Sequence, residues 1–438
     1  GLTEARVDLP LRGPTERLGE APRWRPAAER ALEAALDFGA AGLAAGLPAA
    51  LCEAQGGGDA AEPAYREAAI ARLRVAAELD RSFGSDDLGP YLGRVGPLRR
   101  DDDPRRRRPY ITQLEGLGRC PWQALLEKHL GIERVRDPLA GLPDFEAKVI
   151  GIAVHASLEA VFRAYLTDSH ASLEALEPSQ AVAVDWPDPA ALRDIVQRET
   201  RRALAVAGLR FASFDAIVAE RVLPRVQAAR RLGWPDPGSV LGREVSGKVA
   251  VERSGGGTAE VEFRADRVDL GADGFVLSDY KTGRPISKGK KPSTRREHWL
   301  EKVRQGRHLQ AVAYARARGE PGDAGRFLFL SADDLETEKG RERATFEVRG
   351  DDAEMRAAFD GAVDRLLWLA ETGAYVPHLV SAKAGEEPSV CKYCDVAEAC
   401  LRGDSGASGR LGRWLEAPLE AGSPGESLRL ALRALRDP

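Results

Sequence analysis

The sequence predicts an α/β fold, in which a small β-sheet is packed between helices. Segments rich in β-branched and aromatic residues indicate strands, and segments with apolar residues at helical spacing lie before, between and after them. The strands are predicted at 240–251, 261–270, 275–280, 326–330 and 343–348. A helix around Gln310 separates the third strand from the fourth. The order helix, hairpin, crossover helix and strand is typical of an α/β sandwich.

Helical patterns occupy much of the remaining chain. They are predicted at 27–47, 65–83, 111–118 and 121–130, from 151 onward, and at 190–207, 211–232, 353–372 and 427–435. Pro121 stands at an early helical position, where its missing N–H costs little. We expect a helical N-terminal region at 1–108 without a chemical motif, a central domain at 109–400, and a linker with a short helix at 401–438.

Length and composition limit the class of protein. A chain of 438 residues is long enough for two or three domains, and 43% hydrophobic with 30% charged residues indicates a soluble globular protein. No apolar run approaches the roughly 20 residues that cross a bilayer, and no signal peptide is visible. We therefore expect a cytoplasmic protein without a membrane partner. Because no methionine opens the chain, we expect it to be a piece of a longer protein.

The most informative segment is a predicted β-hairpin around the turn Gly-Ala-Asp-Gly at 271–274. If these four residues form the loop, opposite residues have numbers that sum to 545, and Asp266 lies opposite Asp279. A tighter turn raises the sum to 547 and sets Asp266 opposite Lys281. Either register puts Asp266, Asp279 and Lys281 on one face, because side chains alternate along a strand.

That face also carries four apolar residues, so we expect it to point inward: Val268, Leu270, Phe275 and Leu277. Two carboxylates roughly 5 Å apart on such a face repel each other and lose hydration. A divalent cation removes both problems, and carboxylate oxygens suit Mg²⁺ or Mn²⁺. A nearby ammonium such as that of Lys281 can then orient a water or stabilise charge on a phosphate. The alternative is a surface hairpin with a cross-strand ion pair.

Asp266, followed after a turn by Asp279-Tyr280-Lys281, resembles the core of the PD-(D/E)xK nucleases. The resemblance is to the branch of this family that includes the RecB and AddB nuclease domains and the nucleases of CRISPR adaptation. The resemblance implies a restriction-endonuclease-like core, with helices flanking a mixed central sheet, and a catalytic lysine beside two metal-binding aspartates. The proline that names the motif is absent, since Ala265 precedes Asp266.

The resemblance also suggests roles for residues outside the hairpin. Residues 151–155 open an amphipathic segment that is similar to the family's helix whose histidine joins the metal site, and His155 is the matching histidine. Gln310 and Tyr314 resemble the glutamine–tyrosine motif on the helix after the catalytic lysine, and we expect them near that lysine or the DNA. Glu244 is the nearest candidate for the glutamate that the family often carries on the preceding strand. The main-chain carbonyl of Tyr280 is expected to be another metal ligand.

Four of the five cysteines form a candidate metal-binding set. Cys391, Cys394 and Cys400 follow a C-x2-C-x5-C pattern, and Cys120 lies far upstream, before a proline. By spacing alone, four thiolates suit a [4Fe–4S] cluster or a zinc ion. The set resembles the iron–sulfur staple of AddB-type nucleases, which implies a [4Fe–4S] cluster that ties the two ends of the nuclease domain together. Cys52 has no partner in the sequence and is predicted to be an ordinary apolar residue.

Positive charge is concentrated between Arg284 and Arg307. This segment has nine Lys or Arg residues against Glu297 and Glu301, a local net charge of +7, although the whole chain has a net charge of −4. Its glycines and prolines predict a loop beside the proposed metal. We expect the basic loop 284–307 to contact a nucleic-acid backbone. The alternative is a solvated loop without a partner.

The residues and the resemblance together predict a metal-dependent deoxyribonuclease that acts in DNA end processing and recombinational repair. The resemblance also implies a helicase partner or an upstream helicase domain. Residues 1–108 would then be the end of that helicase-like part. No G-x-x-x-x-G-K-[ST] loop occurs, so an ATP motor would lie elsewhere. Two alternatives stay open: a free-standing exonuclease of the CRISPR-adaptation type, and a nuclease-inactive subunit that binds DNA or a partner.

Overall fold

The computed structural model describes residues 88–89, 92–98, 103, 105, 108–132, 147–166, 171–209, 213–234, 239–378, 389–392, 394–400, 405–419, 421–422 and 425–436. The chain divides into two units, 1–92 and 93–438, and almost all described residues belong to the second. The helices predicted at 27–47 and 65–83 lie outside the described residues. Within the described part of the chain, no helix has the length and apolar character that a bilayer span requires.

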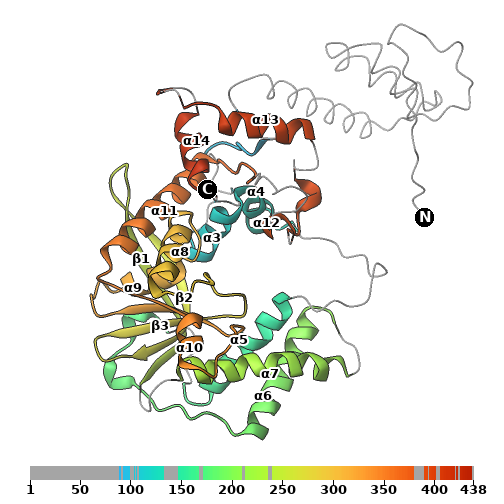
Figure 1. Cartoon of the computed structure of the whole chain (residues 1–438), viewed down its shortest axis with the longest axis vertical. Coiled ribbons are helices and arrows are strands. Elements are labelled where there is room, and N and C mark those ends of the chain that lie inside the picture. The colour runs from blue at the N-terminus through green and yellow to red at the C-terminus, as the bar shows by residue number, and fades with distance from the viewer. Residues whose placement is uncertain are drawn as a thin grey trace, which may run out of the picture. The chain divides into compact units, whose positions relative to one another are not determined.

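Five strands form one sheet in the order β1-β2-β3-β4-β5, which confirms the predicted mixed sheet (Figure 1). The strands are β1 (Val240–Glu252), β2 (Thr258–Leu270), β3 (Phe275–Lys281), β4 (Ala324–Phe329) and β5 (Thr345–Arg349). The first three are antiparallel neighbours, β4 pairs parallel to β3, and β5 pairs antiparallel to β4. A parallel pair needs a crossover, which α8 (Pro292–Arg304) and α9 (Gln310–Arg316) supply.

The hairpin of β2 and β3 has the register that a four-residue turn predicts. Leu270 lies opposite Phe275, and Arg267 lies opposite Ser278, so the numbers of opposite residues sum to 545. Val268, between these two pairs, is completely buried, which confirms that its face of the hairpin points inward.

Helices cover both faces of the sheet (Figure 1). One face carries α5 (Ala147–Arg163), α6 (Pro189–Val206) and α7 (Phe214–Gly233), and the other carries α8, α9 and α11 (Ala353–Thr372). A Cβ atom on Gly325 of β4 would lie 1.8 Å from the carbonyl oxygen of Ala311. Only glycine permits this close approach of α9, so Gly325 sets how near α9 lies to the strands.

Shorter helices complete the described part of the chain. They are α3 (Ile111–Arg119), α4 (Pro121–Ala124), the π-helix η2 (Leu125–His129), η3 (Leu173–Ala175), η4 (Pro178–Gln180), α10 (Glu338–Ala344), α12 (Ser389–Lys392), η5 (Ala397–Ala399), α13 (Ser405–Glu416) and α14 (Glu426–Arg433). α3 packs against β2, α9 and α11 through Ile111, Leu114 and Leu117, which repeat every three residues and are buried.

The prediction of a loop over 284–307 is wrong for most of that range, because α8 occupies Pro292–Arg304. Pro292 stands at the start of the helix, and Trp299, Leu300 and Val303 form a buried stripe on it. The high charge and the glycines of the segment concealed this stripe. Trp299 is 2% exposed and donates from Nε1 to the His308 carbonyl at 3.2 Å, so its ring lies in the core.

Other boundaries also differ from the prediction: α5 begins at Ala147, β2 at Thr258 and β4 at Ala324, each two to four residues before the predicted start. Residues 343–344 belong to α10, and the fifth strand begins only at Thr345. α13 lies within the segment predicted as a linker, where Leu411 and Leu415 are buried one helical turn apart. In these last two cases packing against the rest of the unit decides the structure, and local composition does not reveal it.

The buried side chain of Arg267 joins the sheet to α7. Arg267 has no exposed surface and donates to Asp269 Oδ2 at 2.9 Å, to Tyr280 Oη at 2.5 Å and to the Gly233 carbonyl at 3.0 Å. Arg326 also donates to Asp269 Oδ2, at 3.1 Å. Burial is the largest single effect and would lower the pKa of Arg267, but the charges of Asp269 and Tyr280 and the hydrogen bonds to them together outweigh burial, so the pKa is raised.

We predict that Arg267→Ala lowers the free energy of unfolding by about 3 kcal/mol, because it leaves Asp269 and Tyr280 in the core without their main partner. Urea denaturation followed by circular dichroism measures this change. Arg356→Ala, at an exposed position of α11, is the control and should stay within about 0.5 kcal/mol of the parent. Equal stabilities of the two variants would contradict a structural role for Arg267.

Candidate active site

The site begins where β2 and β3 separate. Their pairing ends at Arg267 and Ser278, and beyond that point Tyr280 N donates to the side chain of Asp266 at 2.7 Å. The carboxylate of Asp266 thus takes the place of a strand partner and holds the two strands at a fork. Asp279 and Lys281 follow on β3, so the fork brings together the three residues of the predicted hairpin motif.

His155 reaches the fork from α5. Its Nδ1 lies 3.3 Å from Asp266 Oδ2. The charge of Asp266 raises the pKa of His155 to about 9 against the opposing effect of burial. Burial alone would raise the pKa of Asp266, but His155 and the amide of Tyr280 hold it below its usual value. His155 therefore lies beside Asp266, as the sequence predicts, and the two side chains form an ion pair.

Lys281 and Asp279 form a second ion pair, with Nζ 2.8 Å from Asp279 Oδ2. Gln310 links the two, because its Oε1 accepts from Lys281 Nζ at 2.5 Å and its Nε2 donates to Asp279 Oδ1 at 3.0 Å. Burial raises the pKa of Asp279, and the charge of Asp266 adds to this effect although Lys281 opposes it. Gln310 lies beside the lysine, as the sequence predicts.

Tyr314 lies one turn after Gln310 on α9. Its Oη donates to the Arg264 carbonyl at 2.8 Å and lies 3.3 Å from Asp279 Oδ1 and from Gln310 Nε2. Tyr314 is completely buried, and burial raises the pKa of its hydroxyl well above the usual value. It is therefore a neutral donor that joins α9 to β2 and β3.

Glu115 of α3 is a member of the site that sequence reasoning missed. Its Oε1 accepts from Leu309 N at 2.6 Å and from Gln310 N at 3.2 Å. Burial raises the pKa of Glu115, while Lys281 and the two amides lower it. One feature of the sequence indicates a special role for Glu115. It is the single acidic residue of α3, a helix whose buried positions are apolar.

Glu244 lies on β1 at the level of Asp266, because the neighbouring pairs are Arg243 with Arg267 and Val245 with Ala265. Its carboxylate is 2.9 Å from Arg264 Nε. Burial and the charge of Asp266 raise the pKa of Glu244 to about 7. Its φ of +51° lies in the left-handed region, which is costly for a residue with a side chain. Strain of this kind is often found at functional sites.

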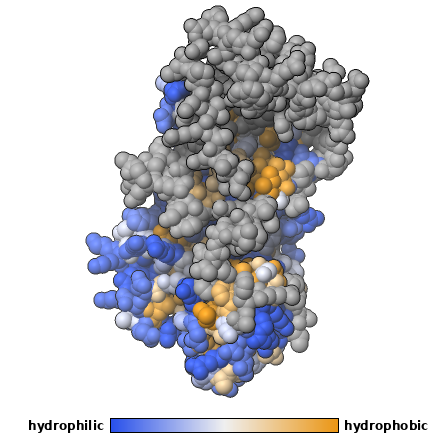
Figure 2. All heavy atoms as spheres, turned by 90° about the vertical axis from the view of Figure 1, so that its right-hand side faces the viewer, coloured by the Kyte–Doolittle hydropathy of each residue, from blue (hydrophilic) through white to orange (hydrophobic). Residues whose placement is uncertain are grey.

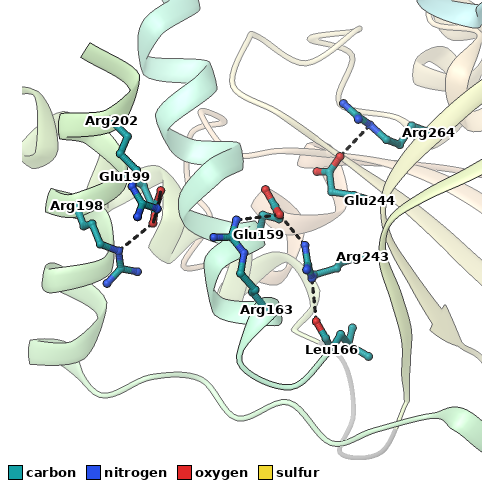
Figure 3. A network of polar contacts seen from close by, with 9 residues as sticks. All are labelled: Glu159, Arg163, Leu166, Arg198, Glu199, Arg202, Arg243, Glu244 and Arg264. Atoms are coloured by element: carbon teal, nitrogen blue, oxygen red, sulfur yellow. Dashed lines mark hydrogen bonds and ion pairs between the residues drawn. The ribbon is translucent and has the colours of Figure 1, made fainter. Parts of the chain in front are cut away.

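A network of charged residues on α5 and β1 lies beside the pair of Glu244 and Arg264 (Figure 3). Arg243 donates to Glu159 Oε1 at 2.6 Å and to the Leu166 carbonyl at 3.1 Å, and Arg163 approaches Glu159 from the same helix at 2.9 Å. No pattern in the sequence predicts this pairing of α5 with β1. It fixes the helix that carries His155 against the strand that carries Glu244.

A cleft of about 800 Å³ lies between the α3–η2 segment and α5. The site residues that line it are Glu115, His155, Glu159, Glu244, Asp266, Asp279, Lys281 and Gln310. Among the described lining residues the Lys and Arg side chains are Arg119, Lys128, Arg264 and Lys281. Ile152, 50% exposed, adds an apolar side chain to the cleft. On the face of the molecule drawn in Figure 2, hydrophilic and hydrophobic residues are interspersed. None of the described lining residues belongs to 284–307, so the predicted basic segment does not form this wall.

The donor set fits a hard divalent cation. Asp266 and Asp279 supply carboxylate oxygens, and buried Asp279 Oδ2 accepts no hydrogen bond among the described residues, although Lys281 lies close to it. No group of three or more His, Cys, Asp or Glu side chains in the described part of the chain is already arranged around a metal position. Asp266 is instead paired with His155, and Asp279 with Lys281. These two cations supply the positive charge that the two buried aspartates require.

The four predicted cysteine ligands come from two segments that lie against each other. Cys120 follows α3, and Cys391, Cys394 and Cys400 lie on and after α12; no disulfide joins these four described cysteines. The charges of Cys391 and Cys400 act on Cys120, whose pKa is raised mainly by burial. Burial also raises the pKa of Cys394 to about 11. Cys52 lies outside the described residues.

Contacts beside the thiols hold these segments together. Trp122 Nε1 donates to the Ala399 carbonyl at 3.1 Å, and His378 N approaches Cys120 Sγ at 3.5 Å. The donor chemistry of the four cysteines fits a zinc ion or an iron–sulfur cluster, because both suit soft sulfur ligands.

We predict that Glu244→Gly raises the free energy of unfolding by about 1 kcal/mol, because glycine adopts a φ of +51° without strain. The lost ion pair with half-exposed Arg264 offsets only a small part of this gain. Ser246→Gly, two residues along the same strand, is the matched control and should destabilise by about 0.5 kcal/mol. Thermal or urea unfolding of both variants checks the difference, and destabilisation by Glu244→Gly would show that the backbone there is unstrained.

Comparison with known proteins places the chain in a family. The sequence pattern of the PD-(D/E)XK nuclease superfamily matches residues 111–401. A solved structure titled "Crystal structure of SSO0001" is 15% identical, covers 59% of this chain and 98% of that one, and has a TM-score of 0.25, too low to support any argument. No curated protein matches. The family match spans more than half of the chain and includes the whole sheet, so this chain belongs to the PD-(D/E)XK nuclease superfamily.

Proposed function

We propose that this chain is a metal-dependent deoxyribonuclease that hydrolyses phosphodiester bonds at the fork of β2 and β3. The observation that carries the proposal is the meeting of Asp266, Asp279 and Lys281 at the base of one cleft. Membership of the superfamily supports the same chemistry. Like charges are costly when buried together, so a site in which the charge of Asp266 acts on Asp279 and Glu244 favours a cation-binding role over an inactive scaffold.

The ligands that we propose for Mg²⁺ or Mn²⁺ are Asp266, Asp279, His155 and the main-chain carbonyl of Tyr280. When bound, such an ion polarises a phosphate oxygen and lowers the pKa of a water. Lys281 orients the attacking water or stabilises charge that develops on the phosphate. Gln310 holds the ammonium in place, and Tyr314 fixes Gln310 and Asp279 relative to β2.

We propose DNA as the substrate, bound along the cleft through its phosphates. Arg119, Lys128 and Arg264 supply positive charge near the carboxylates, and Ile152 offers an apolar contact for a base. Arg284, Lys288 and Lys290, exposed in the loop that leaves β3, extend this positive surface beyond the cleft. Phosphate contacts of this kind give affinity that falls with salt and carry little sequence information.

The biological setting that we propose is DNA end processing in recombinational repair, with a helicase partner or an upstream helicase domain. It rests on the resemblance to AddB-type nuclease domains. By the same resemblance, Cys120, Cys391, Cys394 and Cys400 would hold a [4Fe–4S] cluster. Since ligand binding by thiols from both ends of the nuclease domain would add to its folding energy, the cluster would act as a structural staple.

Asp279→Ala tests the nuclease directly. We expect cleavage of linear DNA in Mg²⁺ or Mn²⁺ by the parent, and a rate at least about 1000-fold lower in the variant, since losing the metal site removes several kcal/mol of transition-state stabilisation. Asp273→Ala, an exposed aspartate in the turn of the same hairpin, is the matched control and should keep full activity. Full activity of Asp279→Ala, or no cleavage by the folded parent with any DNA form, would reject the proposal.

Anaerobic purification tests the cluster separately. The parent should be brown, absorb broadly in the visible range and contain iron, whereas Cys394→Ser should lose both the colour and the iron. Cys52→Ser should keep both, because Cys52 is not part of the proposed set. Elemental analysis decides between metals, and stoichiometric zinc in place of iron would refute the iron–sulfur assignment.

A further inference from the structure

α3 contacts the turn before α9 at two points. Glu115 Oε1 accepts from the amides of Leu309 and Gln310 at 2.6 and 3.2 Å. Three residues later on the same helix, a Cβ on Gly118 would lie 2.3 Å from the carbonyl oxygen of Gly306. The backbone of α3 therefore lies directly on this turn, and the carboxylate of Glu115 fixes the end that leads into α9.

The turn itself has an unusual backbone. Gly306 has a φ of +77°, and His308 has a φ of +54°, a left-handed conformation that is unfavourable for histidine. Leu309, which precedes the first residue of α9, has no side-chain oxygen with which to cap the helix. Glu115 supplies that acceptor from a position 194 residues earlier in the sequence. Without it, two amides at the site would lose their partner, which is costly where water is excluded.

Gln310, whose amide donates to Glu115, is also the residue that contacts Lys281. Gln310 begins α9, accepts from Lys281 Nζ and donates to Asp279 Oδ1. We propose that Glu115 is a positioning residue, which fixes the start of α9 and thereby sets where Gln310 holds Lys281. This inference rests on the proposed nuclease function, and it gives α3 a role in catalysis.

A different role for Glu115 would be to act through its charge, as a metal ligand or a base. The geometry favours positioning, because Oε1 is occupied by two backbone amides. The two roles make opposite predictions for Glu115→Gln. A glutamine side chain keeps an oxygen that accepts from both amides, but it has no negative charge.

Steady-state cleavage kinetics separate the roles. Glu115→Ala should lower kcat by about 100-fold with little change in KM, since small misplacement of a catalytic group has effects of this size. Glu115→Gln should stay within about threefold of the parent. Gln113→Ala, a half-buried neighbour on α3 that does not line the cleft, is the control and should behave as the parent. Equal losses in Glu115→Gln and Glu115→Ala, or no loss in Glu115→Ala, would overturn the proposal.

Amide hydrogen exchange provides a readout that does not need cleavage. Peptides covering residues 306–312 should exchange faster in Glu115→Ala than in the parent or in Glu115→Gln, because only the alanine variant frees the amides of Leu309 and Gln310. Unchanged exchange in Glu115→Ala would overturn the positioning role even if activity fell. A parent that cleaves no DNA would reject the proposed function, and the exchange result would still decide whether Glu115 fixes the turn.

Discussion

The bond between the amide of Tyr280 and the carboxylate of Asp266 is the contact on which the site depends. A sheet that continued its ladder past Arg267 and Ser278 would satisfy that amide with a backbone carbonyl and leave no space between the strands. By accepting the bond itself, Asp266 ends the pairing and remains at the fork with Asp279. Gly325 contributes from the other side, since it lets α9 approach β4 closely enough for Gln310 and Tyr314 to reach the same carboxylates.

Charge compensation explains how so many acidic groups share the site. His155 neutralises Asp266, Lys281 neutralises Asp279, and Arg264 neutralises Glu244, each at 3.3 Å or less. These pairs offset the repulsion between the carboxylates. A divalent ion that binds the aspartates has to compete with His155 and Lys281, so the histidine that we propose as a ligand is also a partner that the metal must displace.

Strand alternation made the centre of the site predictable. The hairpin register follows from a four-residue turn, as the structure confirms. The period of two then predicts that Asp266 and Asp279 lie near each other, and in the structure the charge of Asp266 acts on Asp279. The positions of Gln310, Tyr314 and His155 beside them agree with the resemblance. α8 was missed because its buried stripe of Trp299, Leu300 and Val303 is outnumbered by charges, and Glu115 was missed because its partners are far away in the sequence. Such contacts depend on how helices pack, which no local pattern records.

α3 is a helix of nine residues, about 13 Å long, with Glu115 in its middle and Cys120 directly after its last residue. A helix this short does not bend appreciably, so its two ends move as one piece. The position of Cys120 is consequently coupled through one rigid segment to the start of α9, where Gln310 contacts Lys281. Under the nuclease function that we propose, oxidation of the Cys120 thiol would lower activity by shifting Gln310 and Lys281, although it alters neither side chain chemically.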